Sequence, residues 1–219
     1  MDKAEYRSKL DQLTSLADKE DYKGALAIVE SVDWRRVKSI RTLSMVADVY
    51  EANKMYPEAN DILLLAYDRA SIGKGILYRL VEVSVKMQDF ESAEEYYEEF
   101  VSVAPHDTSR YLLRYKILRG KKAPLDDQIE MLEAYKDAEF TERWSYELAL
   151  LYSKNGQTQK CIDTCDELEL WFSEGKYVTK ALELKMKYAP LTPSQQMKYE
   201  NAGEDLSEKQ VDSLLNRMD

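Results

Sequence analysis

The sequence predicts an all-α protein, a solenoid of about six antiparallel helical hairpins. Only seven glycines and five prolines interrupt the 219 residues, too few for the turns of an all-β fold. Long stretches instead combine strong helix-forming residues with apolar positions three or four apart, which is the spacing of one helix face. A third observation, a repeat of fixed period, predicts how these helices are arranged.

The repeat consists of an aromatic residue followed three positions later by a small residue. The aromatics are Tyr22, Tyr56 and Phe90, and the small residues are Ala25, Ala59, Ala93 and, two periods later, Cys161. An aromatic after a tight turn opens a second helix, and the small residue one turn later lets two helices approach closely. Because a single hairpin cannot bury its apolar face alone, neighbouring hairpins must stack.

This pattern resembles the tetratricopeptide repeat, a 34-residue helix–turn–helix unit. First-helix residues stand where that family places its large, small and aromatic positions, as in Val46-Ala47 with Tyr50 and Leu148-Ala149 with Tyr152. The resemblance implies a right-handed superhelical solenoid over residues 1–203. Its repeats are expected near 6–39, 40–73, 74–107, 108–141, 142–175 and 176–203.

The fourth repeat departs from the pattern. The 34-residue period calls for a small residue at position 127, where the sequence has Asp127. The preceding stretch, 124–129, has the composition of a turn with one extra residue. We expect a helix to follow it and to bury Ile129, Leu132 and Tyr135.

The two ends of the array also differ from the central repeats. Leu13 replaces the usual small residue in the first repeat, which predicts a loosened terminal helix. A short polar helix over 194–201 is expected to face solvent as a cap. In the segment 204–219, Val211, Leu214, Leu215 and Met218 share one helical face, so this segment is either a frayed tail or cap, or an amphipathic helix that docks on a neighbouring surface.

The residues that usually carry chemistry do not form a site. His106 is alone in a turn, and two cysteines with one distant histidine cannot make a structural zinc site. Cys161 and Cys165 share a helix face, and we interpret them as core packing. No phosphate-binding or nucleophile motif occurs. The sequence therefore predicts no enzymatic activity, no metal and no cofactor.

Net charge and hydropathy limit the classes of partner that the chain is expected to bind. The net charge of −10 makes nucleic acid the weaker candidate, because nucleic-acid binding usually needs a basic surface. No run of about 18 apolar residues is present to span a membrane. Two cysteines imply no disulfide framework, and a cytoplasmic protein is the simplest interpretation. Homo-oligomers through the end hairpins or the tail are an open alternative.

Arrays of this family bind ligands on the concave side lined by their first helices, so the resemblance implies a groove for a peptide or protein partner. The side chains expected to line it are Tyr78, Leu112, Lys116, Arg119, Arg143 and Tyr146. The lysine and asparagine clamp of chaperone-binding members is missing, since Leu10, Thr14 and Asp48 stand at its positions. The basic stretch 110–122 favours an acidic partner or is an ordinary solvated helix face. The sequence thus predicts a protein-binding scaffold, with a self-assembly module or a peptide sensor as alternatives.

Overall fold

The computed structural model describes residues 3–70 and 73–202, and these residues form helices and loops without a strand. The all-α prediction is therefore confirmed. The chain divides into two compact units, Met1–Lys122 and Ala123–Asp219. The boundary falls inside the predicted fourth repeat, between its two helices. The single repeat domain over 1–203 and its six hairpins remain predictions.

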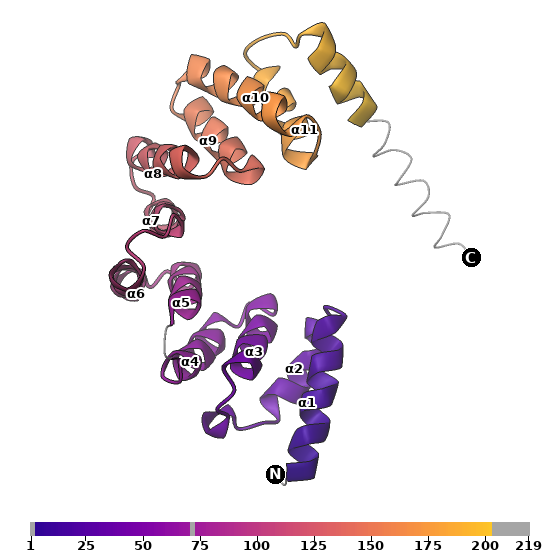
Figure 1. Cartoon of the computed structure of the whole chain (residues 1–219), viewed down its shortest axis with the longest axis vertical. Helices are drawn as coiled ribbons and strands as arrows, with labels where there is room; N and C mark the ends of the chain where they lie inside the picture. Colours follow the sequence, from indigo (N-terminus) through magenta and orange to yellow (C-terminus); the bar gives the residue numbers. More distant parts are fainter. Residues whose placement is uncertain (1–2, 71–72, 203–219) are drawn as a thin grey trace, which may run out of the picture. The chain divides into compact units, whose positions relative to one another are not determined.

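The first unit is a succession of helical hairpins (Figure 1). Its helices are α1 (Lys3–Asp18), α2 (Tyr22–Glu30), α3 (Ile40–Ala52), α4 (Tyr56–Tyr67), α5 (Lys74–Met87), α6 (Phe90–Val103) and α7 (Ser109–Gly120), with one 3₁₀ turn, η1 (Trp34–Arg36). The pairs α1–α2, α3–α4 and α5–α6 pack together, and α2 also packs on α3 and α4 on α5. The seventh helix contacts both α5 and α6. Each hairpin therefore buries its apolar face against the next, as the repeat requires.

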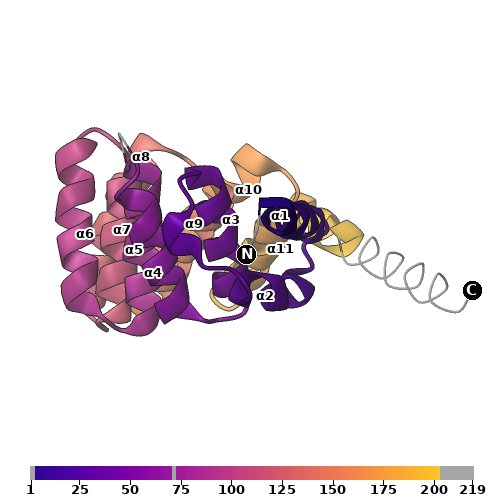
Figure 2. The same ribbon diagram turned by 90° about the horizontal axis from the view of Figure 1, so that it is seen from below.

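The second unit continues the same alternation. Its helices are α8 (Leu125–Ala138), α9 (Glu142–Lys154), α10 (Thr158–Phe172) and α11 (Lys176–Lys185), and residues 193–202 are also helical. Helix α9 packs on α8 and α10, and α11 contacts both α9 and α10. Figure 2 gives a second view of the ribbon, in which α10 and α11 lie next to each other. The short helix expected over 194–201 is confirmed.

The second helix of each of the first three hairpins begins at the aromatic residue of the repeat. Tyr22, Tyr56 and Phe90 are the first residues of α2, α4 and α6. Two of these helices are capped by an aspartate just before the aromatic: Asp21 accepts from the Gly24 amide at 2.9 Å, and Asp89 from the Ser92 amide at 3.1 Å. Such caps satisfy amides that the helix leaves without a partner.

The turns between paired helices show the repeat a second time. Glu20, Lys54, Gln88, Lys122 and Gly156 all have positive φ, between 56° and 71°, and follow one another at the period of the repeat. Four of the five are not glycine, so the left-handed conformation is imposed by the packed hairpin rather than favoured by the residue. Lys122 still lies 34 residues after Gln88, so the extra residue of the fourth repeat must come after Lys122.

The small-residue positions lie in the core, as predicted. Ala25, Ala59, Ala93 and Cys161 are all fully buried. In the fourth repeat Asp127 is exposed and Gln128, one residue later, is buried instead. The Gln128 side chain donates to the Ala123 carbonyl oxygen at 2.7 Å, which satisfies the amide inside the core.

Helix α8 also confirms the predicted buried face. Ile129, Leu132 and Tyr135 are each less than one-tenth exposed. At the other end of the chain, Leu13 is the buried residue of α1. Tyr6 and Leu16 of the same helix are partly buried against the core.

The two cysteines are core residues. Both side chains are fully buried and carry free thiols. Burial raises the pKa of Cys161 and of Cys165 above the ordinary value of a thiol. Because the thiolate is the reactive form, this environment suits packing rather than redox chemistry.

A buried polar cluster holds the terminal helix to the second unit. The Lys185 ammonium, only 6% exposed, lies 2.5 Å from the Asp166 carboxylate and donates to the Gln195 side-chain oxygen at 3.0 Å. Gln195 in turn donates to Asp166 at 2.6 Å. These contacts fix residues 193–202 beside α10. The predicted segment 204–219 lies outside the described residues. Within the described ranges, no helix has the length and apolarity that crossing a membrane demands.

Candidate functional site

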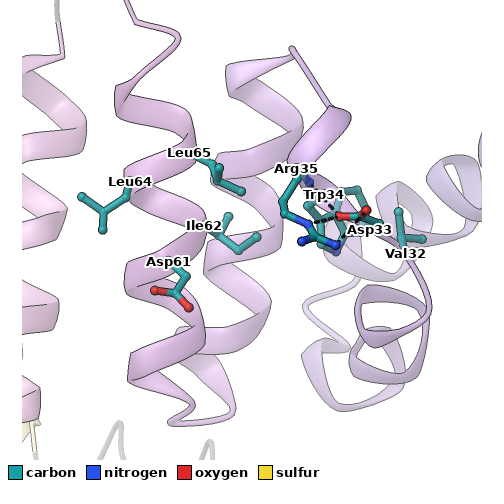
Figure 3. A pocket seen from close by; sticks show the side chains of 8 residues that line it. All are labelled: Val32, Asp33, Trp34, Arg35, Asp61, Ile62, Leu64 and Leu65. Carbon is teal, nitrogen blue, oxygen red and sulfur yellow. Dashed lines mark hydrogen bonds and ion pairs between the residues drawn. The ribbon is translucent and has the colours of Figure 1, made fainter.

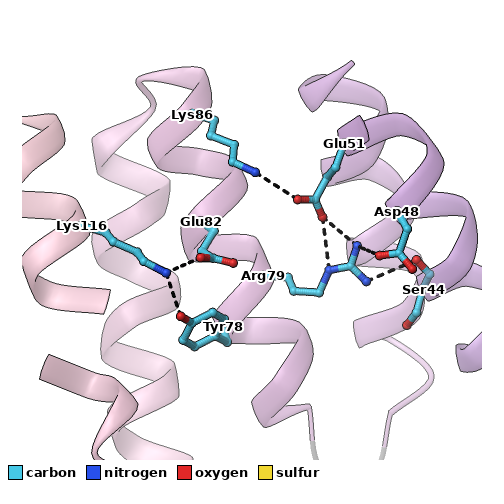
Figure 4. Close-up of polar contacts among 8 residues, drawn as sticks. All are labelled: Ser44, Asp48, Glu51, Tyr78, Arg79, Glu82, Lys86 and Lys116. Carbon is cyan, nitrogen blue, oxygen red and sulfur yellow. Dashed lines mark hydrogen bonds and ion pairs between the residues drawn. The ribbon is translucent and has the colours of Figure 1, made fainter. Parts of the chain in front are cut away.

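Polar side chains connect the first helices of successive hairpins in the first unit (Figure 4). They come from α3, α5 and α7, and on α5 they follow the spacing of one helix face at positions 78, 82 and 86. The figure shows them meeting in the spaces between neighbouring helices. The contacts form two clusters, one around Arg79 and one around Lys116.

The Arg79 guanidinium joins α5 to α3. Its Nη2 lies 2.7 Å from both the Asp48 and the Glu51 carboxylates, and its Nη1 donates to the Ser44 carbonyl oxygen at 3.2 Å. Lys86 adds a second cation at 3.2 Å from Glu51. Burial raises the pKa of Asp48 even though Arg79 works against that shift. The guanidinium is therefore satisfied within the chain.

Lys116 joins α7 to α5. Its ammonium donates to the Tyr78 hydroxyl at 2.7 Å, forms an ion pair with Glu82, and lies 4.8 Å from the centre of the Tyr78 ring. The Tyr78 ring meets Phe100 edge to face at 6.4 Å. Two of the predicted groove residues, Tyr78 and Lys116, are therefore in direct contact. A carboxylate from a partner would have to compete with Glu82 for Lys116.

The other predicted residues of the first unit have different surroundings. Leu112 is only 6% exposed, so it belongs to the packed interior and offers little surface to a partner. Arg119 is exposed on α7. The basic stretch 110–122 also faces α6, where Arg114 and Lys121 pair with Glu94.

The remaining two predicted residues belong to the second unit. The Arg143 guanidinium lies over the Trp144 ring at 4.7 Å. Tyr146 on α9 packs against Tyr177 on α11, with 5.8 Å between ring centres and 44° between ring planes. Burial, helped by the Glu183 carboxylate, raises the pKa of Tyr146. The Lys180 ammonium lies 6.0 Å from the Tyr146 ring centre and 5.8 Å from that of Tyr177.

Sequence reasoning missed Arg79 and Tyr177 as members of these surfaces. The 34-residue period contained part of the signal, because Glu82 and Lys116, and likewise Tyr146 and Lys180, are one period apart. Residues one period apart on first helices face each other in adjacent hairpins. Arg79 lies between Tyr78 and Glu82 on α5. The repeat period alone therefore does not predict that Arg79 contacts the neighbouring first helix.

A separate hollow of about 450 Å³ lies on the second-helix side of the first unit, between η1 and α4 (Figure 3). Ile62 and Leu65 line its α4 side, and Trp34 and Arg35 line its η1 side. The Arg35 guanidinium is held by Asp33 at 2.8 Å, and this contact lowers the pKa of the Asp33 carboxyl. Its η1 side belongs to the linker between α2 and α3.

Within the part of the chain that the structure describes, no three histidine, cysteine or acidic side chains gather as metal ligands. His106 is exposed in its turn, as expected. The acidic side chains of α6 are mostly exposed, and Glu94 is engaged by Arg114 and Lys121. The surfaces that stand out are therefore the two faces made by first helices.

Comparison with known structures supports this architecture. A tetratricopeptide repeat protein from Parabacteroides merdae superposes with a TM-score of 0.62 at 12% identity, covering 89% of this chain and 83% of the other. MamA from Desulfovibrio magneticus gives 0.56 at 16% identity, over 84% of this chain and 97% of the other. YrrB, described as a tetratricopeptide repeat protein with an unusual peptide-binding site, gives 0.53 at 18% identity over 80% and 90%. These likenesses show a shared fold.

Sequence comparison points the same way. The tetratricopeptide repeat family model matches residues 75–107, which hold α5 and α6. Comparison with curated proteins finds no match. The fold and the matched repeat together define an array of helical repeats of the tetratricopeptide type. The chain therefore contains a tetratricopeptide repeat at residues 75–107, and its 34-residue period and its fold resemble those of tetratricopeptide repeat proteins.

Proposed function

We propose that this chain is a non-enzymatic scaffold that holds an extended segment of a partner protein against its first helices. The observation that carries the proposal is the line of contacts from α3 through α5 to α7. The side chains of Arg79, Glu51, Glu82 and Lys116 are largely buried, between 18% and 28% exposed, and already fixed by one another. A surface whose side chains are ordered before binding loses less conformational entropy when a partner arrives.

The partner segment is proposed to be acidic. Arg119 and Arg143 are exposed arginines on first helices, and arginine gives charge-assisted, oriented contacts to carboxylates. Tyr78 and Tyr146 supply aromatic surface beside them, and tyrosine and arginine are favoured anchors in protein interfaces.

Charge reversal of both arginines, Arg119→Glu with Arg143→Glu, tests this function. We expect the affinity for a captured acidic partner to fall at least tenfold, about 1.4 kcal/mol, because two attractive contacts become repulsive. The matched control is Lys23→Glu with Lys160→Glu, which changes the net charge equally on second helices. Equal affinity of the arginine variant and wild type, with unchanged circular dichroism, would remove both arginines from the binding surface.

Self-assembly is a second candidate because one observation favours it. Leu170 and Trp171, at the end of α10, are 74% and 69% exposed. Phe140 lies beside Trp171 with 6.1 Å between ring centres and stacks on Phe172 at 5.4 Å. Exposed apolar side chains gathered in this way are typical of contact surfaces between proteins.

A further inference from the structure

The face of α9 and α11 in the second unit carries a cluster of cations held by aromatic rings. The rings of Tyr146 and Tyr177 pack against each other in this cluster. The Lys180 ammonium lies about equally far from both ring centres. Lys176, one turn before Lys180, lies 5.8 Å from the Tyr177 ring centre. Attraction between an ammonium and a ring face fixes the position of the cation without using up its hydrogen-bond donors.

The acidic side chains near this cluster have polar partners of their own. Glu142 accepts from the Tyr177 backbone amide at 3.2 Å. Glu183 accepts from the Tyr199 hydroxyl at 3.4 Å. Glu147 also has a polar or electrostatic partner. These carboxylates keep their negative charge, and burial, with help from Glu183 and Glu147, raises the pKa of Tyr146. No ion pair, however, joins Glu142 or Glu183 to Lys176 or Lys180 among the described residues.

The cations are in the opposite situation. Among the described residues, Lys176, Lys180 and Arg143 form ring contacts and no ion pair. The first unit differs, because there Arg79 and Lys116 are each compensated by carboxylates. On the face of α9 and α11, in contrast to Arg79 and Lys116, these cations have aromatic contacts and no ion pair among the described residues.

We propose that Tyr146, Tyr177, Lys176 and Lys180 form the specific seat for a carboxylate side chain of the partner segment. The two lysines donate to the carboxylate oxygens, and the tyrosine rings pack against the aliphatic part of the acidic side chain. This inference rests on the proposed function and adds a carboxylate contact on the α9–α11 face to those proposed for Arg119 and Arg143. Lys180 is its central residue because its ammonium lies 6.0 Å from the Tyr146 ring centre and 5.8 Å from the Tyr177 ring centre.

The seat is tested with a defined probe, an acetylated and amidated peptide of alternating serine and glutamate carrying a fluorescent label. Its affinity for the full chain is measured by fluorescence anisotropy. The matched probe replaces every glutamate by glutamine. We expect the glutamate peptide to bind and the glutamine peptide to bind at least about tenfold more weakly, because the neutral amide gains no charge-assisted contact.

Three variants locate the binding. Lys180→Glu is expected to weaken the glutamate peptide about fivefold or more, and Lys180→Arg to restore it to within about twofold of wild type. Lys187→Glu, an exposed lysine of the same unit outside the cluster, is expected to leave the affinity within about twofold. Thermal denaturation of each variant checks that the unit remains folded.

Equal binding of the two peptides, or equal binding of the glutamate peptide to wild type and Lys180→Glu, overturns the proposal. Failure of the seat and failure of the proposed function are distinguishable. If a native partner still crosslinks to first-helix positions while the glutamate peptide ignores Lys180, the scaffold function stands and the seat does not. If the glutamate peptide depends on Lys180 but no partner crosslinks to the first helices, the reverse holds.

Discussion

Arg79 and Lys116 show how much of a binding surface is decided by individual side-chain contacts. Lys116 was predicted as a groove cation, and it does contact Tyr78. The sequence could not show that Glu82 compensates its charge, because that depends on which of several rotamers the two long side chains adopt. The position of a residue on the repeat is predictable, while the availability of its charge is not.

Asp107 is a residue whose charge state affects stability. Its carboxylate accepts from Lys74 at 2.6 Å and from the Ser109 amide at 2.9 Å, and the Lys74 contact lowers its pKa below the ordinary value. A carboxyl whose pKa is lower in the folded state stabilises the fold above its unfolded pKa, and this contribution is lost as the pH falls through the folded pKa.

We therefore expect Asp107→Asn to lower the free energy of unfolding by about 0.5–1 kcal/mol at neutral pH, with the deficit lost as the pH falls through the lowered pKa of the Asp107 carboxyl. Urea denaturation of wild type and variant across this range measures it. Lys74→Gln should flatten the pH dependence in the same way. A deficit that stays constant down to the lowest pH would show that the Asp107 charge plays no part.

At the scale of helices and turns, the repeat was largely predictable. The aromatic and small positions predicted where α2, α4 and α6 begin. The buried face of α8 was also predicted correctly, although the fourth repeat has an extra residue before this helix. The left-handed turn residues were missed, because glutamate, lysine and glutamine give no local signal for positive φ. Only Gly156 carries the expected glycine at such a turn.

The turn at Gln88 allows a direct test of imposed strain. Gln88 is exposed and has φ of 61°. Replacing it with glycine removes the steric cost of the left-handed conformation, so we expect Gln88→Gly to raise the free energy of unfolding by about 0.5–1 kcal/mol. Thermal or urea denaturation measures the change.

The control for this turn is Glu95→Gly, at an exposed position inside α6. There glycine should cost about 1 kcal/mol, since the helix gains nothing from the extra backbone freedom. Destabilisation by both substitutions would contradict the view that the turn residue is strained.

For the whole molecule, the sequence predicted the fold class and the kind of repeat, because a fixed period constrains every hairpin in the same way. It did not predict the division into Met1–Lys122 and Ala123–Asp219. The extra residue after Lys122 was visible in the sequence. The sequence did not show that the boundary between the two units lies at the same place.

Self-assembly is tested on the full chain by light scattering over a range of concentrations. Association through Leu170 and Trp171 predicts a mass that rises above 25.5 kDa with concentration and returns to that value in Leu170→Ser with Trp171→Ser, because the apolar contact is removed. A wild-type mass that stays at the monomer value excludes this role for the surface.

The central claim is that a partner segment lies against the first helices, and site-specific photo-crosslinking tests it most directly. A crosslinking amino acid replaces Tyr78 on α5 in one protein, Tyr146 on α9 in a second and Tyr96 on α6 in a third. All three positions are partly buried tyrosines, and only Tyr96 lies on a second helix. We expect the same partner to be crosslinked from positions 78 and 146 and not from position 96. A partner captured from position 96 alone would contradict it.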